Sequence, residues 1–226
     1  MNLFSVRAIP TTSWSSSFPL NFRPQLLTLV NLCAGLTLFG LGEALMLASG
    51  FGVSPWLVLA DGLSIGLGLS IGMTTFVISL AVLLLWVPLR QVPGLGTILN
   101  ALIIAAVIDL SLPYLPAPSS IVLQAIESVV GIVLIGLGSA MYLIAKLGPG
   151  PRDGLMTGLQ RLTGRPIAVV RTSIEIAVLV TGWLLGGTIG FGTLLFAFGV
   201  GPALSVGLLL VLWVSEDIGS TDGVVE

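Results

Sequence analysis

Long apolar runs constrain this chain more strongly than any other feature of its sequence. Hydrophobic residues make up 55% of its 226 residues and charged residues only 8%, whereas about a quarter of an ordinary globular domain is charged. Several runs reach the ~20 helical residues that are needed to cross a ~30 Å hydrocarbon core. They are continuous and lack the short alternating pattern of membrane strands. The sequence therefore predicts an all-α polytopic membrane protein.

Eight apolar segments follow one another along the chain. They are Leu26–Ser49, Pro55–Leu69, Ile71–Leu89, Thr97–Leu112, Ile121–Ala145, Arg152–Leu162, Ile167–Leu185 and Phe191–Val214. A polar N-terminal tail over residues 1–25 precedes them, and an acidic tail over residues 215–226 follows. The first tail lacks the basic flank and the short apolar core of a cleaved signal peptide.

A duplication organises these segments. Gly40-Leu41-Gly42 recurs 96 residues later as Gly136-Leu137-Gly138. The same offset, without a gap, pairs Gly52 with Gly148, Pro55 with Pro151, and Gly94-x-Gly96-Thr97 with Gly190-x-Gly192-Thr193. Chance apolar similarity would not keep glycines, prolines and threonines in register. We therefore predict two homologous transmembrane repeats, residues 26–113 and 121–214, which are joined by a Pro-rich linker over residues 114–120.

The number of spans in each repeat decides how the two repeats are oriented. Four spans per repeat give eight transmembrane helices in two parallel four-helix repeats. Three spans and one short helix per repeat give six full transmembrane helices plus two short Gly/Pro-initiated helices, with the repeats inverted as in many transporters. The second and sixth segments are the shortest, and proline and glycine open both.

The positive residues favour six spans. Lys and Arg accumulate in cytoplasmic loops, and the chain has eight of them. With eight spans and a cytoplasmic N-terminus, Arg90, Lys146 and Arg152 fall outside, whereas with six spans all eight lie at or near the cytoplasmic side. We therefore expect a multi-pass protein of the inner (cytoplasmic) cell membrane with both termini in the cytoplasm. Eight spans remain the alternative.

Two equivalent turns open the short helices. One is Gly148-Pro149-Gly150-Pro151-Arg152-Asp153-Gly154, and its partner is the stretch Gly52–Val58. Glycine reaches backbone angles that other residues avoid, and proline is favoured at the first helical position. We interpret six residues as structural residues of these turns: Gly52, Pro55, Gly148, Gly150, Pro151 and Gly154. Only the second turn carries an Arg-Asp pair, so a site is expected there first.

Ionisable residues within apolar segments are the candidate site residues, because charge inside a membrane is costly. They are Glu43, Asp61, Arg152, Asp153, Arg171 and Glu175. Arg171 and Glu175 lie four residues apart and can pair on one helix face. The pair either anchors the helix to a neighbour or places Arg171 in a cavity, where it could hold an anionic group. The equivalent positions in the second repeat are Ser139 for Glu43 and Thr157 for Asp61, so the duplicated fold does not require a charge at either position.

Composition narrows the functional classes. The chain has no His, and its single Cys33 lies in an apolar run. No nucleophile–base pair is visible, so we expect no enzyme, no metal site and no cofactor. A net charge of −2 gives no indication of a nucleic-acid partner. The expected partners are the lipid bilayer and a small polar or charged solute, and the small size of the chain is compatible with a homodimer.

A set of motifs is shared with known proteins. The motifs are Gly148–Leu155, then Arg171 and Glu175, then Gly182–Ala197 with Gly201-Pro202 after it, and Gly52-Val53-Ser54-Pro55-Trp56 in the first half. In these motifs the chain resembles a family of bacterial membrane proteins known as YczE, YyaS and YitT, and it is most similar to the YczE-like branch. It has Leu57 where the family often has an acidic residue. The resemblance implies an integral protein of the bacterial cell membrane and no particular activity.

The duplication, the interrupted short helices and the intramembrane charges together favour a small-solute transporter or permease with a site between the repeats. In this hypothesis Arg152, Asp153, Arg171 and Glu175 contact the solute, and Glu43 and Asp61 are proton or cation sites. The alternative is a non-transporting membrane scaffold or an accessory protein of a partner enzyme.

Overall fold

The computed structural model describes residues 9–221, and the side chains as far as residue 215. Within this range the chain forms α-helices and one 3₁₀ turn, and it contains no strand. The elements are α1 (Leu26–Ser49), α2 (Pro55–Leu67), α3 (Ile71–Trp86), α4 (Leu95–Ser111), η1 (Leu112–Tyr114), α5 (Ile121–Ala145), α6 (Pro151–Thr163), α7 (Ile167–Leu184) and α8 (Phe191–Thr221). The predicted all-α class is confirmed.

Five helices in the described part of the chain are long and apolar enough to cross a membrane. These are α1, α4 with its extension η1, α5, α7 and α8. Helices α2 and α3 qualify only together, and the chain bends by 109° at the break between them. They therefore supply at most one more span. A total of five or six spans agrees with the prediction of six full spans.

The short helices α2 and α6 begin at the two Gly/Pro turns. Pro55 and Pro151 are their first residues, and each helix has 13 residues. Proline suits this position because its missing N–H would have no partner within the helix. The hydroxyl of Ser54 caps α2, whereas Gly150 precedes α6 and offers no capping side chain. At α6 the carboxylate of Asp153 instead lies in the first turn, where the helix dipole favours a negative charge.

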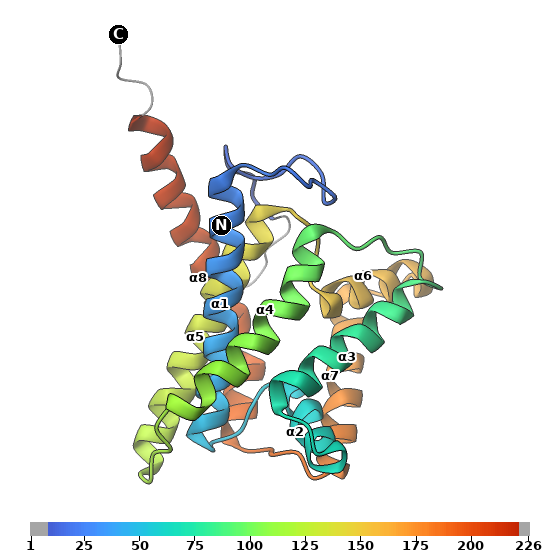
Figure 1. Ribbon diagram of the computed structural model, residues 1–226, viewed down its shortest axis with the longest axis vertical. Helices are drawn as coiled ribbons and strands as arrows, with labels where there is room; N and C mark the ends of the chain where they lie inside the picture. Colours follow the sequence, from blue (N-terminus) through green and yellow to red (C-terminus); the bar gives the residue numbers. More distant parts are fainter. Residues whose placement is uncertain (1–8, 222–226) are drawn as a thin grey trace.

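Helices α1 and α5 pack against each other and run in opposite directions (Figure 1). A Cβ on Gly42 would lie 2.5 Å from the Gly131 carbonyl oxygen, and one on Gly35 would lie 2.8 Å from the Gly138 carbonyl oxygen. Small residues allow this close approach of two backbones, which is how membrane helices gain packing energy without a hydrophobic driving force. Helix α4 packs on α1, and α8 packs on α5.

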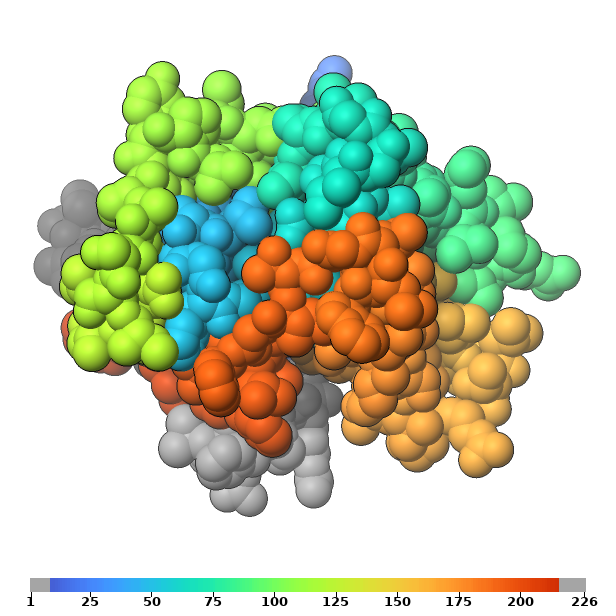
Figure 2. Space-filling model, turned by 90° about the horizontal axis from the view of Figure 1, so that it is seen from below, coloured from blue at the N-terminus to red at the C-terminus, as the bar shows by residue number. Residues whose placement is uncertain are grey.

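The two halves exchange contacts instead of packing separately. Helix α2 packs against α7, and α6 packs against α3. The Gly96 N–H donates to the Leu147 carbonyl at 2.7 Å, and the Gly192 N–H donates to the Phe51 carbonyl at 2.8 Å. Figure 2 shows the α2–α3 turn beside the connection between α7 and α8. Each half therefore completes the packing of the other.

Gly52 and Gly148 make these crossed contacts possible. Their φ angles are +116° and +109°, in the region that favours glycine. A Cβ on Gly52 would lie 2.7 Å from the Gly190 Cα, and one on Gly148 would lie 2.8 Å from the Gly94 Cα. Both positions thus need glycine for conformation and for space.

The N-terminal segment over residues 9–25 contains no helix but packs on the ends of α5 and α8. The Trp14 side chain is buried, and its indole N–H donates to the Ser215 hydroxyl at 3.1 Å. The Ser15 hydroxyl donates to the Ile144 carbonyl at 2.7 Å. Helix α8 continues past Val214 to Thr221, because no proline interrupts these residues, so the first part of the acidic tail is helical.

Candidate functional site

A cavity of about 120 Å³ lies between the two halves of the chain. Both halves line it, and six pairs of lining residues lie 96 positions apart: Phe39 and Ile135, Glu43 and Ser139, Ser54 and Gly150, Trp56 and Arg152, Asn100 and Phe196, and Ile104 and Val200. Equivalent positions therefore face one shared space. The side chains differ within every pair, so the chemistry of the cavity is asymmetric.

Glu43 is the most enclosed charge in the cavity, with 1% of its surface exposed. It comes from α1. The Ser54 hydroxyl lies 2.9 and 2.8 Å from its two carboxylate oxygens and donates to them. The Arg152 Nη1 lies 3.7 Å from the Oε1 atom. Because Ser54 is also the N-cap of α2, the turn before α2 places the hydroxyl beside the carboxylate. A buried carboxylate requires partners of this kind.

Arg152 lies over the indole ring of Trp56, with its Cζ atom 5.1 Å from the ring centroid. This is a cation–π contact. At 3.7 Å, the ion pair with Glu43 exceeds hydrogen-bond distance, so it leaves the N–H donors of the guanidinium available. The indole N–H of Trp56 is buried and has no hydrogen-bond partner among the described residues.

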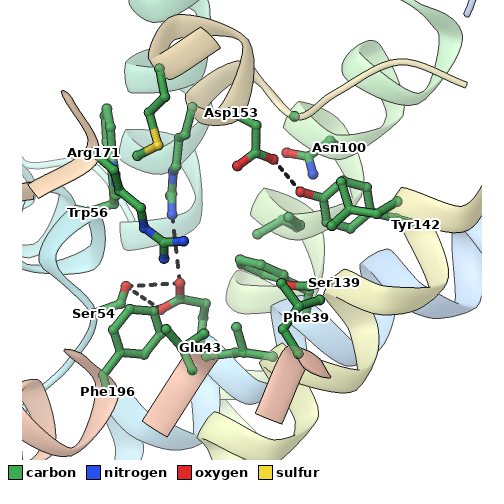
Figure 3. Close-up of a pocket in the computed structure, with 18 of the residues that line it drawn as sticks. Phe39, Glu43, Ser54, Trp56, Asn100, Ser139, Tyr142, Asp153, Arg171 and Phe196 are labelled. Carbon is green, nitrogen blue, oxygen red and sulfur yellow. Dashed lines mark hydrogen bonds and ion pairs between the residues drawn. The ribbon is translucent and has the colours of Figure 1, made fainter. Parts of the chain in front are cut away.

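The opposite side of the cavity carries a second polar group. The Tyr142 hydroxyl of α5 donates to the Asp153 carboxylate of α6. Figure 3 shows Asp153, Asn100 and Tyr142 together on one side, across the open space from Glu43 and Ser54. The Asn100 side chain projects from α4 and lines the same space. Helices α1, α4, α5, α6 and α7 all contribute polar or charged side chains to this cavity, and α2 contributes the indole of Trp56.

Arg171 and Glu175 form the ion pair that their four-residue spacing predicted. The Arg171 Nε donates to the Glu175 Oε1 at 2.8 Å. Their side chains are 46% and 25% exposed, and both line the cavity. Helix α7 therefore brings them to the more open part of the cavity. The two terminal amino groups of Arg171 are left free of this bond.

Five of the six candidate site residues meet in this cavity, and Asp61 does not. The Asp61 carboxylate accepts a hydrogen bond from the Thr188 backbone N–H at 2.8 Å. It thereby ties α2 to the connection that follows α7. Asp109 has a similar position, since it accepts from the Gly72 N–H at 2.8 Å at the start of α3. Both carboxylates satisfy backbone groups that would otherwise lack partners.

Sequence reasoning did not place Ser54, Trp56 and Tyr142 in the site. A signal for each was present in the chain. Ser54 and Trp56 flank the first residue of α2 and match Gly150 and Arg152 in the second half. Tyr142 lies three residues after Ser139, the partner position of Glu43, and so shares its helix face.

A family model described as "Family of unknown function (DUF6198)" matches residues 26–207, a range that contains every lining residue of the cavity. The chain belongs to this family. A protein of Haemophilus influenzae named "Uncharacterized protein" is 41% identical to it over 206 residues, which cover 91% of this chain and 94% of the relative. No solved structure matches the chain significantly.

Two Bacillus subtilis proteins are also similar to this DUF6198 chain. The "Uncharacterized membrane protein YczE" is 36% identical over 178 residues, covering 77% of this chain and 82% of the relative. The "Uncharacterized protein YyaS" is 36% identical over 167 residues, covering 71% and 82%. The predicted resemblance to YczE and YyaS is confirmed. Together with the apolar helices, it makes this chain a multi-pass integral membrane protein.

Proposed function

We propose that this chain is a small-solute transporter whose substrate site is the cavity between its two halves. The observation that carries the proposal is the meeting of five ionisable side chains, from α1, α6 and α7, in one cavity of a membrane protein. Charges at such positions are costly, and in membrane proteins they mark the paths of ions and polar solutes. A volume of about 120 Å³ suits a small solute.

In this proposal the two halves are inverted copies of one unit. Corresponding helices begin 96 residues apart, at Pro55 and Pro151, Ile71 and Ile167, and Leu95 and Phe191. Helices α1 and α5 run in opposite directions, as do α4 and α8 (Figure 1). Inverted halves around one central site permit alternating access, because rocking one half against the other exposes the site to either side.

The proposal also places the protein in the inner membrane with both termini in the cytoplasm. The start of α1 and the end of α5 lie at the same end of the molecule, and α6 lies between that end and the middle (Figure 1). These elements carry or adjoin Arg23, Lys146, Arg152 and Arg161. Clustered positive residues favour the cytoplasmic side. The arrangement supports six crossings, with α2 and α6 entering from opposite faces.

Flux measurements on the full-length protein test the transporter proposal. Proteoliposomes would be filled with a small-molecule extract, and the loss of each solute would be followed by mass spectrometry. We expect at least one solute to leave faster than from empty vesicles, and Arg171→Ala or Glu43→Gln to slow it roughly tenfold or more, as expected for the loss of a charge-assisted hydrogen bond. Arg165→Ala, an exposed arginine outside the cavity, is the matched control.

Efflux indistinguishable from that of empty vesicles for every solute would contradict the proposal. The non-transporting scaffold would then be the better interpretation. Equal slowing by Arg165→Ala would show that arginine loss acts on the protein in general and not through the cavity.

A further inference from the structure

Hydrogen-bond donors are in excess in the cavity. Each of its three carboxylates already accepts a bond: Glu43 from Ser54, Asp153 from Tyr142, and Glu175 from Arg171. Several hydrogen-bond donors, in contrast, have no acceptor at hydrogen-bond distance among the described residues. The Trp56 indole N–H is buried without a partner among the described residues, and Arg152 meets Glu43 only at 3.7 Å. The terminal amino groups of Arg171 and the amide of Asn100 line the same space.

An excess of donors selects a ligand that is rich in acceptor oxygens. A guanidinium group offers a planar fork of N–H groups that matches a carboxylate. Two such groups line this cavity, from α6 and α7, and the Trp56 ring lines it as well. An organic cation would meet carboxylates that each already accept a hydrogen bond, and it would place its charge near Arg152 and Arg171. The donors therefore favour an anion over a cation.

The charge balance of the cavity adds a condition. Glu43, Asp153 and Glu175 oppose Arg152 and Arg171, so the five groups carry a net charge of −1 when all are ionised. An anion that pairs with Arg152 in place of Glu43 would change the net charge of the cavity from −1 to −2. It would also leave the Glu43 carboxylate without its cation. Breaking a buried ion pair in this way is strongly unfavourable. Uptake of a proton by Glu43 restores the balance, and the neutral carboxyl can still bond to Ser54.

We propose that the cavity binds a small monocarboxylate together with one proton, which Glu43 takes up from water as the anion engages Arg152 and Arg171. The proposal rests on the proposed transport function, and it names the substrate class and the coupled ion. No covalent bond is made or broken in the substrate. The anion and the proton enter as a pair, so the charge of the cavity is the same before and after binding.

Glu43 is the proton site because it is the most enclosed carboxylate of the cavity, and Arg152, the cation that the anion engages, is its ion-pair partner. Helix α6 presents Arg152 and Asp153, α5 presents Tyr142, and α7 presents Arg171 and Glu175. Asp153 lies in the first turn of α6, where the dipole favours its charge, and Glu175 holds Arg171 at 2.8 Å in a more exposed setting. The lining residues of α2, α4 and α8 include no acid or base.

Calorimetry on the purified full-length protein tests the proposal. The probes are propionate and benzoate, with propionamide as a neutral analogue and methylguanidinium as a cation. Titration in two buffers of different ionisation enthalpy counts the protons taken up. We expect both anions to bind with uptake of about one proton, so that Kd falls by about tenfold for each unit that the pH is lowered. Propionamide and methylguanidinium should bind far more weakly.

Variants then assign the groups. Glu43→Gln is permanently neutral, so we expect it to bind propionate without proton uptake and without dependence on pH. Arg152→Gln should lose binding, and Trp56→Phe, which keeps a ring but removes the N–H, should weaken it roughly fivefold. Arg165→Gln, outside the cavity, should behave as the wild type. A circular dichroism spectrum of each variant checks that it is folded.

Three results would overturn the inference. One is binding of methylguanidinium without binding of either anion, another is the absence of any response to both anions, and the third is unchanged proton uptake in Glu43→Gln. The transport proposal fails separately. Anion binding with proton uptake, but without flux in vesicles, would support the monocarboxylate site and contradict the transport function. Flux of a cation or a neutral solute that depends on the cavity residues would support the transport function and contradict the monocarboxylate site.

Discussion

Single residues set the shape of this site through packing as well as through charge. Gly154 follows Arg152 and Asp153 directly, and a Cβ at this position would lie 1.9 Å from the Trp86 Cζ2 atom. The Trp86 indole N–H donates to the Pro151 carbonyl at 3.0 Å. The ring therefore lies flush against the first turn of α6 and fixes the direction in which Arg152 and Asp153 leave the helix.

We expect Gly154→Ala to destabilise the protein by about 1–3 kcal/mol, because the added methyl group forces Trp86 out of its place. Gly66→Ala is the matched control, since Gly66 is an exposed helical glycine with open space around it. Alanine there should stabilise by up to about 1 kcal/mol. Melting temperatures in detergent measure both effects. Equal melting temperatures for the two variants would show that the close contact between Gly154 and Trp86 does not affect stability.

At the level of elements, the two short helices depend on the turns before them. The turn at Gly52 brings α2 against the connection that precedes α8, and the turn at Gly148 brings α6 against the start of α4. These turns also place Ser54 beside Glu43 and Arg152 over Trp56. The conformation of a few glycines therefore sets the geometry of the polar side chains.

A comparison of Gly50 with Gly52 separates the two reasons why such a turn needs glycine, which are backbone conformation and space. Both have positive φ, at +64° and +116°. A Cβ on Gly52 would lie within 3 Å of backbone atoms, whereas a Cβ on Gly50 would have open space around it. We expect Gly50→Ala to cost about 1–2 kcal/mol, for backbone strain alone. Gly52→Ala should cost more, because overlap with Gly190 is added. Thermal melting ranks the two variants, and a smaller loss for Gly52→Ala would contradict this account of the crossed contact.

The whole molecule is held together by contacts that cross between its halves. Because α2 packs on α7 and α6 packs on α3, neither half of the described chain contains a complete helix cluster of its own. The cavity arises where these exchanged helices meet α1 and α5. A change in the relation of the halves would therefore move Glu43 relative to Arg152, as alternating access requires.

The topology of the whole molecule can be tested with two single cysteines in a Cys33→Ser background. Gly66→Cys lies near the end of α2, and Arg161→Cys lies near the end of α6, and both positions are exposed. In inverted halves we expect a membrane-impermeant maleimide to label them from opposite faces of the membrane. Eight spans in parallel halves would put them on the same face. Labelling from one face would therefore contradict the inverted arrangement.

The sequence alone determined the elements and most of the charged residues of the site. Apolar runs must be helical in a bilayer, because every backbone group needs an internal partner there. Proline and glycine mark where such helices begin, so the starts at Pro55 and Pro151 could be read directly. The cost of charge in a membrane singled out Glu43 and Arg171, among others, before any contact was known.

Only the tertiary structure decided which of these residues share a space. Asp61 and Glu43 look alike in the sequence, yet one caps a connection at Thr188 and the other faces the cavity. Glu43 meets Arg152 across 109 positions of the chain, and Tyr142 and Asp153 meet from different helices. Such meetings follow from close contacts between glycine backbones and from helices exchanged between the halves. Hydropathy reports local burial, and it carries no information on which distant residues come into contact.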